Sequence, residues 1–451
     1  MSEMPSLPDV DVQPPAYAGP PREAVHADRR SHLSPHIGHM YREPLMLVSG
    51  HGQYVYDETG RRYLDAFGGV LTTSIGHANP RLLSAVAEQA GRIMHNSMHY
   101  LNPTVSAYAR ELAARFPDPL DTVILFNSGS EANDMAIMAA RLFTGNYDVI
   151  GLRNAFHGTL SGIVPLIAHQ SWRYPLPADP GISRAGWIYA YRGPWAHDEP
   201  GAGEHCAEQI ATHIAEATPG RIAAFFAETI QGVGGVVEPP PGFLSAAATH
   251  VRQAGGLYIA DEVQTGFGRT GDAYWGFEAH GVTPDIVTMA KGIGNGFPIG
   301  ALVTRREIAE VLGQKMTYNT YGGSPLACAA GLAVLEEIDA ASMVDNARAC
   351  GARLLERLDN LAGKQALIGD IRGRGLMIGV ELVRDRATKE PARAETDLAL
   401  EALRQMGCLV GRAGFAGNVL RITPPMCATL EDMDFIADCL EIALATASEG
   451  V

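Results

Sequence analysis

The residue best suited to covalent chemistry in this sequence is Lys291, which follows a short apolar run. Ile286–Met289 is too short for a helix and rich in branched side chains, so it predicts a buried strand that leads to this lysine. Burial disfavours the ammonium form and would make the amine a nucleophile able to form Schiff bases. The chain has only four lysines, and the other three lie in polar or loop-like stretches: Lys315, Lys364 and Lys389.

Two further apolar runs end in carboxylates. Ile222–Ala227 is followed by Glu228, and Leu257–Ala260 is followed by Asp261 and Glu262. A carboxylate buried at the end of a strand is costly unless a cation meets it. That cation could be a metal ion, an internal arginine or the protonated nitrogen of a bound ring. A metal site would need a denser cluster of His or Asp ligands than the sequence offers.

A possible anion site follows a fourth run, Val123–Phe126. The segment Asn127–Asn133 (NSGSEAN) predicts the start of a helix that continues to about Leu142. Glycine lets the backbone approach a ligand, and the first N–H groups of a helix are unpaired, so this turn favours a phosphate or another anion. The same residues also fit an ordinary helix start with Ser128 or Ser130 as its cap.

A fifth run, Val149–Leu152, leads to Phe156 and His157. The aromatic ring could stack on a planar ligand, although a core aromatic beside a hydrogen-bonded histidine explains the same pair. Together, the helix start, the ring, the carboxylate and the strand-end lysine match the needs of pyridoxal phosphate (PLP). The lysine binds its aldehyde, the carboxylate keeps its pyridine nitrogen protonated, and the ring then withdraws electrons.

One motif competes with this interpretation. Gly266–Gly271 (GFGRTG) matches the GxGxxG pattern of dinucleotide sites and follows a predicted strand. However, Asp261 and Glu262 would stand beside the pyrophosphate and repel it, and no convincing helix follows. Asp285, near the offset expected for a ribose contact, lies at the start of the next run rather than at its end. We therefore favour PLP over a nicotinamide or flavin cofactor.

The elements that must position these residues alternate along the chain. Short apolar runs separated by helical stretches predict an α/β fold with a mostly parallel sheet covered by helices on both faces. Ligands of such sheets bind beyond the carboxyl ends of the strands, where the lysine and the carboxylates lie. Upstream, His51–Phe67 alternates apolar and polar residues around a Gly60 turn and predicts a hairpin.

The sequence also suggests a division into domains. Ser324 as the N-cap and Pro325 in the first turn predict the start of a helix, at which we place the main boundary, and a smaller α+β region follows. The expected parts are a flexible arm over residues 1–30, an N-terminal segment over 31–75 that packs with the small domain, a large domain over 76–324 and a small domain over 325–451.

The composition narrows the classes of function. A chain of 451 residues is long enough for two or three domains, and its 46% of hydrophobic residues can form a large core. The net charge of −15 argues against nucleic acid or anionic membranes as partners. The six cysteines form no CxxC pair and no apolar stretch is long enough to span a membrane. Residues 1–21 carry Glu3, Asp9 and Asp11 and resemble no signal or transit peptide, so we expect the cytoplasm.

Several motifs resemble the class III, fold-type-I aminotransferases: Asn127–Asn133, Ala260–Gly271, Asp285–Pro298 and Thr320–Gly323. The similarity runs from about His32 to the C-terminus. Within this class, Phe225–Val236 and Asp285–Pro298 are most similar to the alanine–glyoxylate type 2 group, which includes the β-alanine and 3-aminoisobutyrate enzymes. This resemblance implies a PLP-dependent transaminase with a large domain and a smaller α+β domain.

The resemblance assigns roles to individual residues. Lys291 would hold the cofactor and move the substrate proton, Asp261 would pair with the ring nitrogen, and Arg421 would clamp the substrate carboxylate. Thr320 would reach the phosphate of a neighbouring subunit, which implies a homodimer or a dimer of dimers. The other cofactor-binding candidates are Gly129 and Ser130 for the phosphate, Phe156 and Val263 for the ring faces, Gln264 with His157 for the ring hydroxyl, and Glu228.

The resemblance also implies substrates. A ping-pong reaction would move the amine of alanine, β-alanine or 3-aminoisobutyrate to glyoxylate or pyruvate. Related ornithine and 4-aminobutyrate enzymes tend to carry a glutamate where this chain has Val233, and valine would leave Arg421 open to small 2-oxo acids. The alternatives are a class III enzyme for another ω-amino acid, taurine or a polyamine, and a lyase on the same scaffold. A cofactor-free binding protein is disfavoured by the intact lysine and aspartate.

Overall fold

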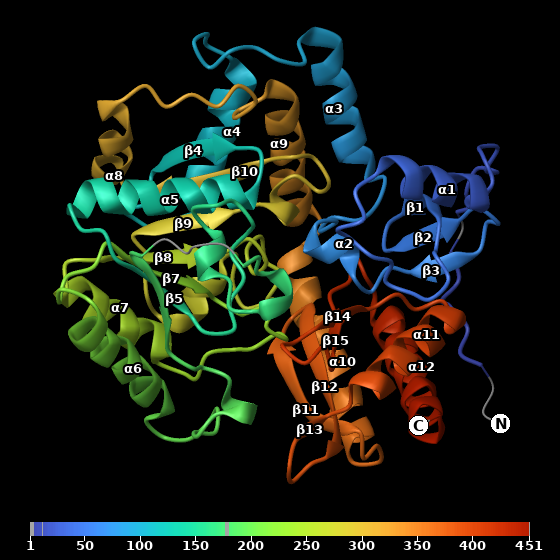
Figure 1. Cartoon of the computed structure of the whole chain (residues 1–451). Coiled ribbons are helices and arrows are strands. Elements are labelled where there is room, and N and C mark those ends of the chain that lie inside the picture. The colour runs from blue at the N-terminus through green and yellow to red at the C-terminus, as the bar shows by residue number, and fades with distance from the viewer. Residues whose placement is uncertain (1–3, 11, 176–179, 451) are drawn as a thin grey trace.

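A computed structural model describes residues 4–10, 12–175 and 180–450 (Figure 1). Its centre is a seven-stranded sheet in the order β4-β10-β9-β8-β7-β5-β6. The strands are β4 (Thr122–Phe126), β10 (Gly300–Thr304), β9 (Ile286–Met289), β8 (Leu257–Asp261), β7 (Ala224–Glu228), β5 (Val149–Leu152) and β6 (Ile182–Ala185). Only β10 runs antiparallel to its two neighbours, so the predicted α/β fold with a mostly parallel sheet is confirmed.

Alternating side chains of these strands enter two hydrophobic clusters, one on each face of the sheet. On β7, Phe225 and Ala227 join the larger cluster, whereas Ala224 and Phe226 join the other. Helices α6 (Ala202–Ala217) and α7 (Phe243–Gln253) contribute to the first cluster, and α5 (Gly129–Thr144) and α8 (Arg306–Glu310) to the second. Burial on both faces explains why these runs are continuously apolar and end abruptly at polar residues.

Helix α9 (Pro325–Ala340) packs against both α3 (Pro80–Arg92) and α4 (Pro103–Ala113) at one end of the sheet. Asn79 and Asn102 cap α3 and α4, and each helix opens with a proline. Ser324 precedes α9 as expected, but its hydroxyl donates to the Met94 carbonyl at 3.3 Å and does not cap the helix. We expected Ser324 to act as the cap, so that part of the prediction was wrong.

A second, antiparallel sheet has the order β11-β12-β15-β14, with a short strand β13 beside β12. Its strands are β11 (Ile368–Arg374), β12 (Met377–Asp385), β13 (Glu390–Pro391), β14 (Gly411–Ala413) and β15 (Val419–Ile422). Helix α12 (Leu430–Glu449) packs against both α10 (Met343–Ala362) and α11 (Arg393–Met406) beside this sheet.

The predicted hairpin is present as β2 (Tyr54–Asp57) and β3 (Arg62–Leu64), and β1 (Leu47–His51) extends it to three strands. This small sheet lies beside α11 and α12 (Figure 1), where the Tyr54 hydroxyl donates to Asp432 at 2.5 Å. Helix α1 (Arg22–His32) lies partly within the expected arm, of which residues 1–3 and 11 are outside the described residues. A short turn, α2 (Gly68–Leu71), follows β3.

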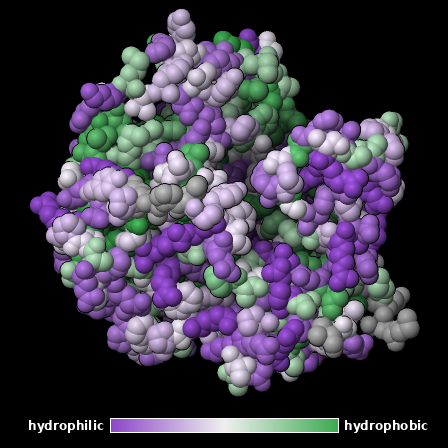
Figure 2. Space-filling view, viewed as in Figure 1, coloured by the Kyte–Doolittle hydropathy of each residue, from purple (hydrophilic) through white to green (hydrophobic). Residues whose placement is uncertain are grey.

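Short 3-10 helices connect several of these elements: Val164–Leu166, Gln170–Trp172, Ala190–Arg192, Gly276–His280, Lys291–Ile293 and Val311–Gln314. Within the described ranges, no helix is both long and apolar enough to cross a membrane. Apolar side chains gather along the upper rim of the face in Figure 2, over α3 and the segment after it. In that segment, Met94, Met98, Tyr100 and Leu101 are exposed.

Candidate active site

Lys291 follows β9 and opens a 3-10 turn with a left-handed backbone, at a φ of 52°. Such a conformation is uncommon for a residue other than glycine and occurs often at functional sites. The residue as a whole is half-buried, but its amine is deep enough for desolvation to lower its pKa to about 8. The nearby Arg421 charge acts in the same direction, and Asp261 and Glu228 oppose it. A neutral, nucleophilic amine is therefore accessible near physiological pH.

Asp261 ends β8 and is buried. Its Oδ2 lies 2.7 Å from His157 Nδ1 and accepts from Asn133 Nδ2 at 3.1 Å, while its Oδ1 accepts from the Val263 N–H at 3.1 Å. A carboxylate has about four acceptor positions, so one remains for a further N–H group. Within the described residues, His157 Nε2 is buried without a hydrogen-bond partner.

Asn133 is a residue of this site that the sequence did not single out. Its amide donates to the carbonyl of His157 at 2.7 Å as well as to Asp261, so one side chain ties both residues to α5. Its position in the sequence could have indicated this role, because Asn133 lies about one turn into the helix that begins at the predicted anion loop. A polar residue on the inner face of that helix needs buried partners.

The predicted anion loop is the N-terminus of α5. The Ser128 hydroxyl accepts from the Glu131 N–H at 3.2 Å, so Ser128 is the cap rather than Ser130. The first backbone hydrogen bond runs from Ala132 N–H to the Ser128 carbonyl, which leaves the N–H groups of Gly129 and Ser130 outside the ladder. A Cβ on Gly129 would lie 3.2 Å from Val263 Cγ2, so glycine allows the loop to approach the end of β8 closely.

Phe156 and Glu228 meet beside this loop. The Phe156 N–H donates to Glu228 Oε1 at 2.9 Å, and the half-buried Phe156 ring packs edge-on against Trp172. Glu228 Oε2 accepts from the Gly232 N–H at 2.9 Å and from Gln264 Nε2 at 3.2 Å. Burial raises the pKa of Glu228 to about 7; the His157 interaction lowers it, and the Asp261 charge adds to the rise.

Arg421 reaches this cluster from β15 of the second sheet. It is 3% exposed, and its Nη2 donates to Gln264 Oε1 at 2.8 Å. Its Nε is buried without a hydrogen-bond partner in the described part of the chain. Burial lowers its pKa to about 10, although the Glu228 charge favours the protonated form. A buried guanidinium with an unused donor has the chemistry of an anion-binding group.

The structure thus brings most of the predicted residues together. Direct hydrogen bonds join His157 to Asp261, Phe156 and Gln264 to Glu228, and Gln264 to Arg421. Thr320 stands apart: it is exposed, and its neighbour Asn319 accepts from Asn127 Nδ2 at 2.8 Å. Val233 is half-buried, and its carbonyl accepts from the Gly414 N–H at 3.0 Å.

The carboxylate that follows Asp261 and the GFGRTG motif that competed with PLP in the sequence both have partners within the protein. Glu262 is buried and accepts from four donors at 2.6 to 2.9 Å: the hydroxyls of Thr229 and Thr265 and the N–H groups of Gly276 and Phe277. Arg269 of the GFGRTG motif is buried and donates to the carbonyls of Pro424 and Leu376. The motif therefore holds the two sheets together. Among the described residues, no group of three or more His, Cys, Asp or Glu could hold a metal ion.

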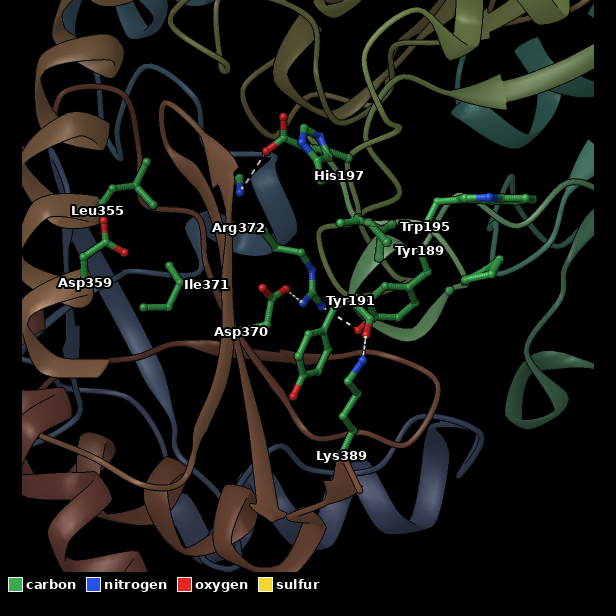
Figure 3. A pocket seen from close by; sticks show the side chains of 17 residues that line it. Tyr189, Tyr191, Trp195, His197, Leu355, Asp359, Asp370, Ile371, Arg372 and Lys389 are labelled. Atoms are coloured by element: carbon green, nitrogen blue, oxygen red, sulfur yellow. Dashed lines mark hydrogen bonds and ion pairs between the residues drawn. The ribbon is translucent and has the colours of Figure 1, made fainter. Parts of the chain in front are cut away.

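A cavity of about 640 Å³ lies elsewhere, between the segment 189–197 and β11 (Figure 3). Arg372 donates to Asp370 at 2.5 Å and to the Tyr189 hydroxyl at 2.7 Å, and Lys389 donates to the Tyr191 carbonyl at 2.6 Å. These cations are paired with groups of the protein itself. Because none of the predicted site residues lines this cavity, cavity volume does not identify the reactive site here.

Comparison with known proteins bears on this geometry. The sequence profile of the family described as aminotransferase class-III matches residues 37–444. An alanine–glyoxylate aminotransferase 2 homolog from Arabidopsis thaliana, named as mitochondrial, is 45% identical and the match covers 97% of this chain and 91% of that protein. The mitochondrial alanine–glyoxylate aminotransferase 2 of Homo sapiens is 40% identical, covering 98% of this chain and 90% of that protein.

Solved structures of PLP-dependent and related enzymes share the fold of this chain. A phospholyase from Arthrobacter in complex with phosphoethanolamine superposes with a TM-score of 0.88 at 36% identity, covering 94% of this chain and 99% of that one. An amine transaminase from an uncultivated Pseudomonas species, in its PLP-bound form, has a TM-score of 0.85 at 33% identity and covers 89% and 95% of the two chains.

Proposed function

Since this chain belongs to the class-III aminotransferase family, we propose that it binds PLP and moves the amine of alanine, β-alanine or 3-aminoisobutyrate to glyoxylate or pyruvate. Family membership makes it an enzyme that transfers amino groups. The observation that carries the proposal is the placement of Lys291, whose amine interacts electrostatically with Asp261, Glu228 and Arg421 at the carboxyl ends of the strands. The individual site residues and the domain boundaries predicted above are parts of this proposal.

The residues present fit PLP. Lys291 has a lowered pKa, Asp261 keeps one acceptor position, and two N–H groups at the start of α5 lie outside the helix ladder. Bound PLP supplies an electron-withdrawing ring that stabilises negative charge at the substrate carbon. Gly129 and Ser130 would hold its phosphate. The remaining contacts would come from Phe156, Val263, Gln264 and His157.

The residues of this chain would then divide the work of the reaction. Lys291 would hold the cofactor through its side-chain amine and, once released by the incoming substrate amine, carry the proton at the substrate carbon. Asp261 would keep the ring nitrogen protonated, and the hydrogen bonds from His157 and Asn133 would keep Asp261 in place. Arg421 would bind the substrate carboxylate through the Nε that has no partner within the described residues.

Two observations support the substrate assignment. The named relatives from Arabidopsis and human are alanine–glyoxylate aminotransferases. Val233 offers no carboxylate that could pair with Arg421, so the guanidinium would stay open to small 2-oxo acids in both half reactions. Alanine and glyoxylate should therefore yield equal amounts of pyruvate and glycine, measured together by chromatography. Ammonia released from phosphoethanolamine, whose phosphate can leave, with no 2-oxo acid acceptor supplied would instead support a lyase, a second candidate favoured by the structural similarity to the Arthrobacter phospholyase in complex with that compound.

The proposal includes a homodimer, or a dimer of dimers, with shared sites. Large apolar side chains are exposed in two segments, over residues 93–101 and 316–321, and such clusters are unusual on a monomer. Thr320 lies in the second of these segments, which agrees with its proposed contact to the neighbouring subunit's phosphate. Light scattering of the purified protein would reveal a monomer, which would contradict this part.

We also propose that the protein is located in the cytoplasm, as expected from the sequence. The named Arabidopsis and human relatives are mitochondrial, so the mitochondrion is the alternative location. Fractionation of the source cells distinguishes the two.

A further inference from the structure

Arg421 is flanked by glycine on both neighbouring strands. Its register partner is Gly379 on β12 and Gly411 on β14. Side chains of register partners in adjacent strands lie on the same face and normally contact each other. The long Arg421 side chain therefore has no side-chain neighbour from either partner position, although it is buried.

Other parts of the chain fill the two spaces. A Cβ on Gly411 would lie 2.1 Å from Cε2 of Phe67, so the Phe67 ring occupies the place of the missing side chain. The Arg421 Cζ lies over that ring, 5.7 Å from its centroid, which is within the range of a cation–π contact. On the other side, a Cβ on Gly379 would lie 3.0 Å from the Gly235 carbonyl oxygen.

Phe67 is held in this place by its backbone. The Thr423 hydroxyl donates to the Phe67 carbonyl at 3.0 Å, and the Thr423 N–H donates to the Ala66 carbonyl at 2.7 Å. Thr423 lies two residues after Arg421, so these bonds join the segment that carries the ring to the strand that carries the guanidinium. The ring itself is half-buried.

The turn after Phe67 has an unusual backbone. Gly68, Gly69, Val70 and Leu71 all have positive φ values, of 57°, 55°, 63° and 60°. For a β-branched residue such as Val70 this conformation is a clear outlier, and it persists only where the surroundings hold it. Here Leu71 is buried in a small cluster with Ile230, Val236 and Met377, and a Cβ on Gly68 would lie 2.6 Å from the Thr423 carbonyl oxygen.

We propose that Phe67 is a positioning residue for carboxylate recognition, because its ring fills the space left by Gly411 and lies beneath the Cζ of the Arg421 guanidinium. With its Cζ over the ring and its Nη2 donating to Gln264, the guanidinium is held at two points, which fixes the plane in which its Nε would meet a carboxylate. A flexible aliphatic side chain at position 67 would leave this plane free to rotate. The proposal rests on the proposed function of Arg421 as the substrate clamp.

The test uses the PLP-loaded enzyme and propionate, a carboxylate that has no amine or 2-oxo group to react. Calorimetry should show that Phe67→Leu and Gly411→Ala each weaken propionate binding about tenfold, whereas Phe67→Tyr, which keeps the ring face, changes it less than about twofold. Phe243→Leu, which shortens a buried core phenylalanine on α7, is the matched control and should leave propionate binding unchanged. Circular dichroism checks that each variant is folded.

Kinetics give a second readout. The same two variants should raise the KM for alanine about tenfold and change kcat little. The proposal would be overturned if wild type, Phe67→Leu and Gly411→Ala bound propionate equally well. It would also be overturned if Phe67→Tyr weakened propionate binding as much as Phe67→Leu does. A wild-type enzyme that binds propionate in a Phe67-dependent way but transfers no amine would refute the proposed reaction and leave the role of Phe67 intact. A wild-type enzyme that binds no propionate would overturn both roles at Arg421.

Discussion

His157 Nδ1 lies 2.7 Å from Asp261 Oδ2, although the two residues are 104 positions apart in the chain. The contact joins the loop after β5 to the end of β8. The Asn133 amide and the Val263 N–H also donate to the Asp261 carboxylate, so three hydrogen bonds hold this carboxylate in place and one of its about four acceptor positions remains. An aspartate held in this way can bind the protonated nitrogen of a ring without moving.

Lys291→Ala should abolish amino-group transfer, by at least about a thousandfold, and leave the protein folded. Both the attachment of the cofactor and the transfer of the substrate proton are assigned to this amine. Turnover is measured with alanine and glyoxylate, and folding by circular dichroism. Lys364→Ala removes an exposed lysine and serves as the control, with activity close to wild type. Appreciable turnover by the Lys291 variant would refute the assignment.

Asp261→Asn should lower kcat by about a hundredfold or more, because a neutral amide cannot keep the ring nitrogen protonated. Single-turnover kinetics with alanine isolate the half reaction that depends on this proton. His157→Phe should give a smaller loss, since Asp261 would still accept from Asn133 and the Val263 N–H. An undiminished rate in Asp261→Asn would mean that another group protonates the ring.

The lowered pKa of Lys291 predicts how cofactor capture depends on pH. A pKa of about 8 instead of 10.5 means that the reactive neutral amine already dominates just above pH 8. In cofactor-free protein, the rate of PLP capture should rise with pH up to about 8 and then level off. Stopped-flow absorbance measures this rate, with the side-chain amine of Nα-acetyl-lysine in solution as the reference. A rate that climbs roughly tenfold per pH unit up to pH 10 would contradict the lowered pKa.

Val233→Glu should raise the KM for both alanine and glyoxylate, by about tenfold, because a carboxylate at this position would compete for Arg421. Val233→Gln has nearly the same size without the charge, and it separates electrostatic competition from crowding. Steady-state kinetics with each substrate provide the comparison. If the glutamine variant loses as much as the glutamate variant, the effect is steric and the argument from charge fails.

The residues at strand ends could be predicted because burial on both faces of the sheet makes each strand a continuous apolar run. Lys291, Asp261 and Glu228 break such runs and were therefore visible. Two strands of the same sheet were missed. The edge strand β6 (ISRA) is half polar and therefore is not a continuous apolar run. Strand β10 begins soon after Lys291, directly behind a glycine-rich loop, and was not separated from that loop.

The contacts that complete the site could not be predicted, because they join segments far apart in the chain. Nothing in the sequence around Phe67, which follows β3, indicates that its ring supports Arg421 on β15 of the second sheet. That relation depends on register, since it requires Gly411 and Arg421 to be paired. Likewise, the role of Arg269 in holding Pro424 and Leu376 is hidden in a motif that resembles a dinucleotide site.

The most direct test of the account is the visible absorbance of the PLP-loaded protein, followed as L-alanine and then glyoxylate are added. We predict that alanine bleaches the band of the lysine-bound cofactor and that glyoxylate restores it, because the two half reactions share Lys291, Asp261 and Arg421. A band that alanine leaves unchanged would contradict the assigned donor. No band at all after PLP is supplied would contradict the central claim, that Lys291 is the cofactor-binding residue of an aminotransferase.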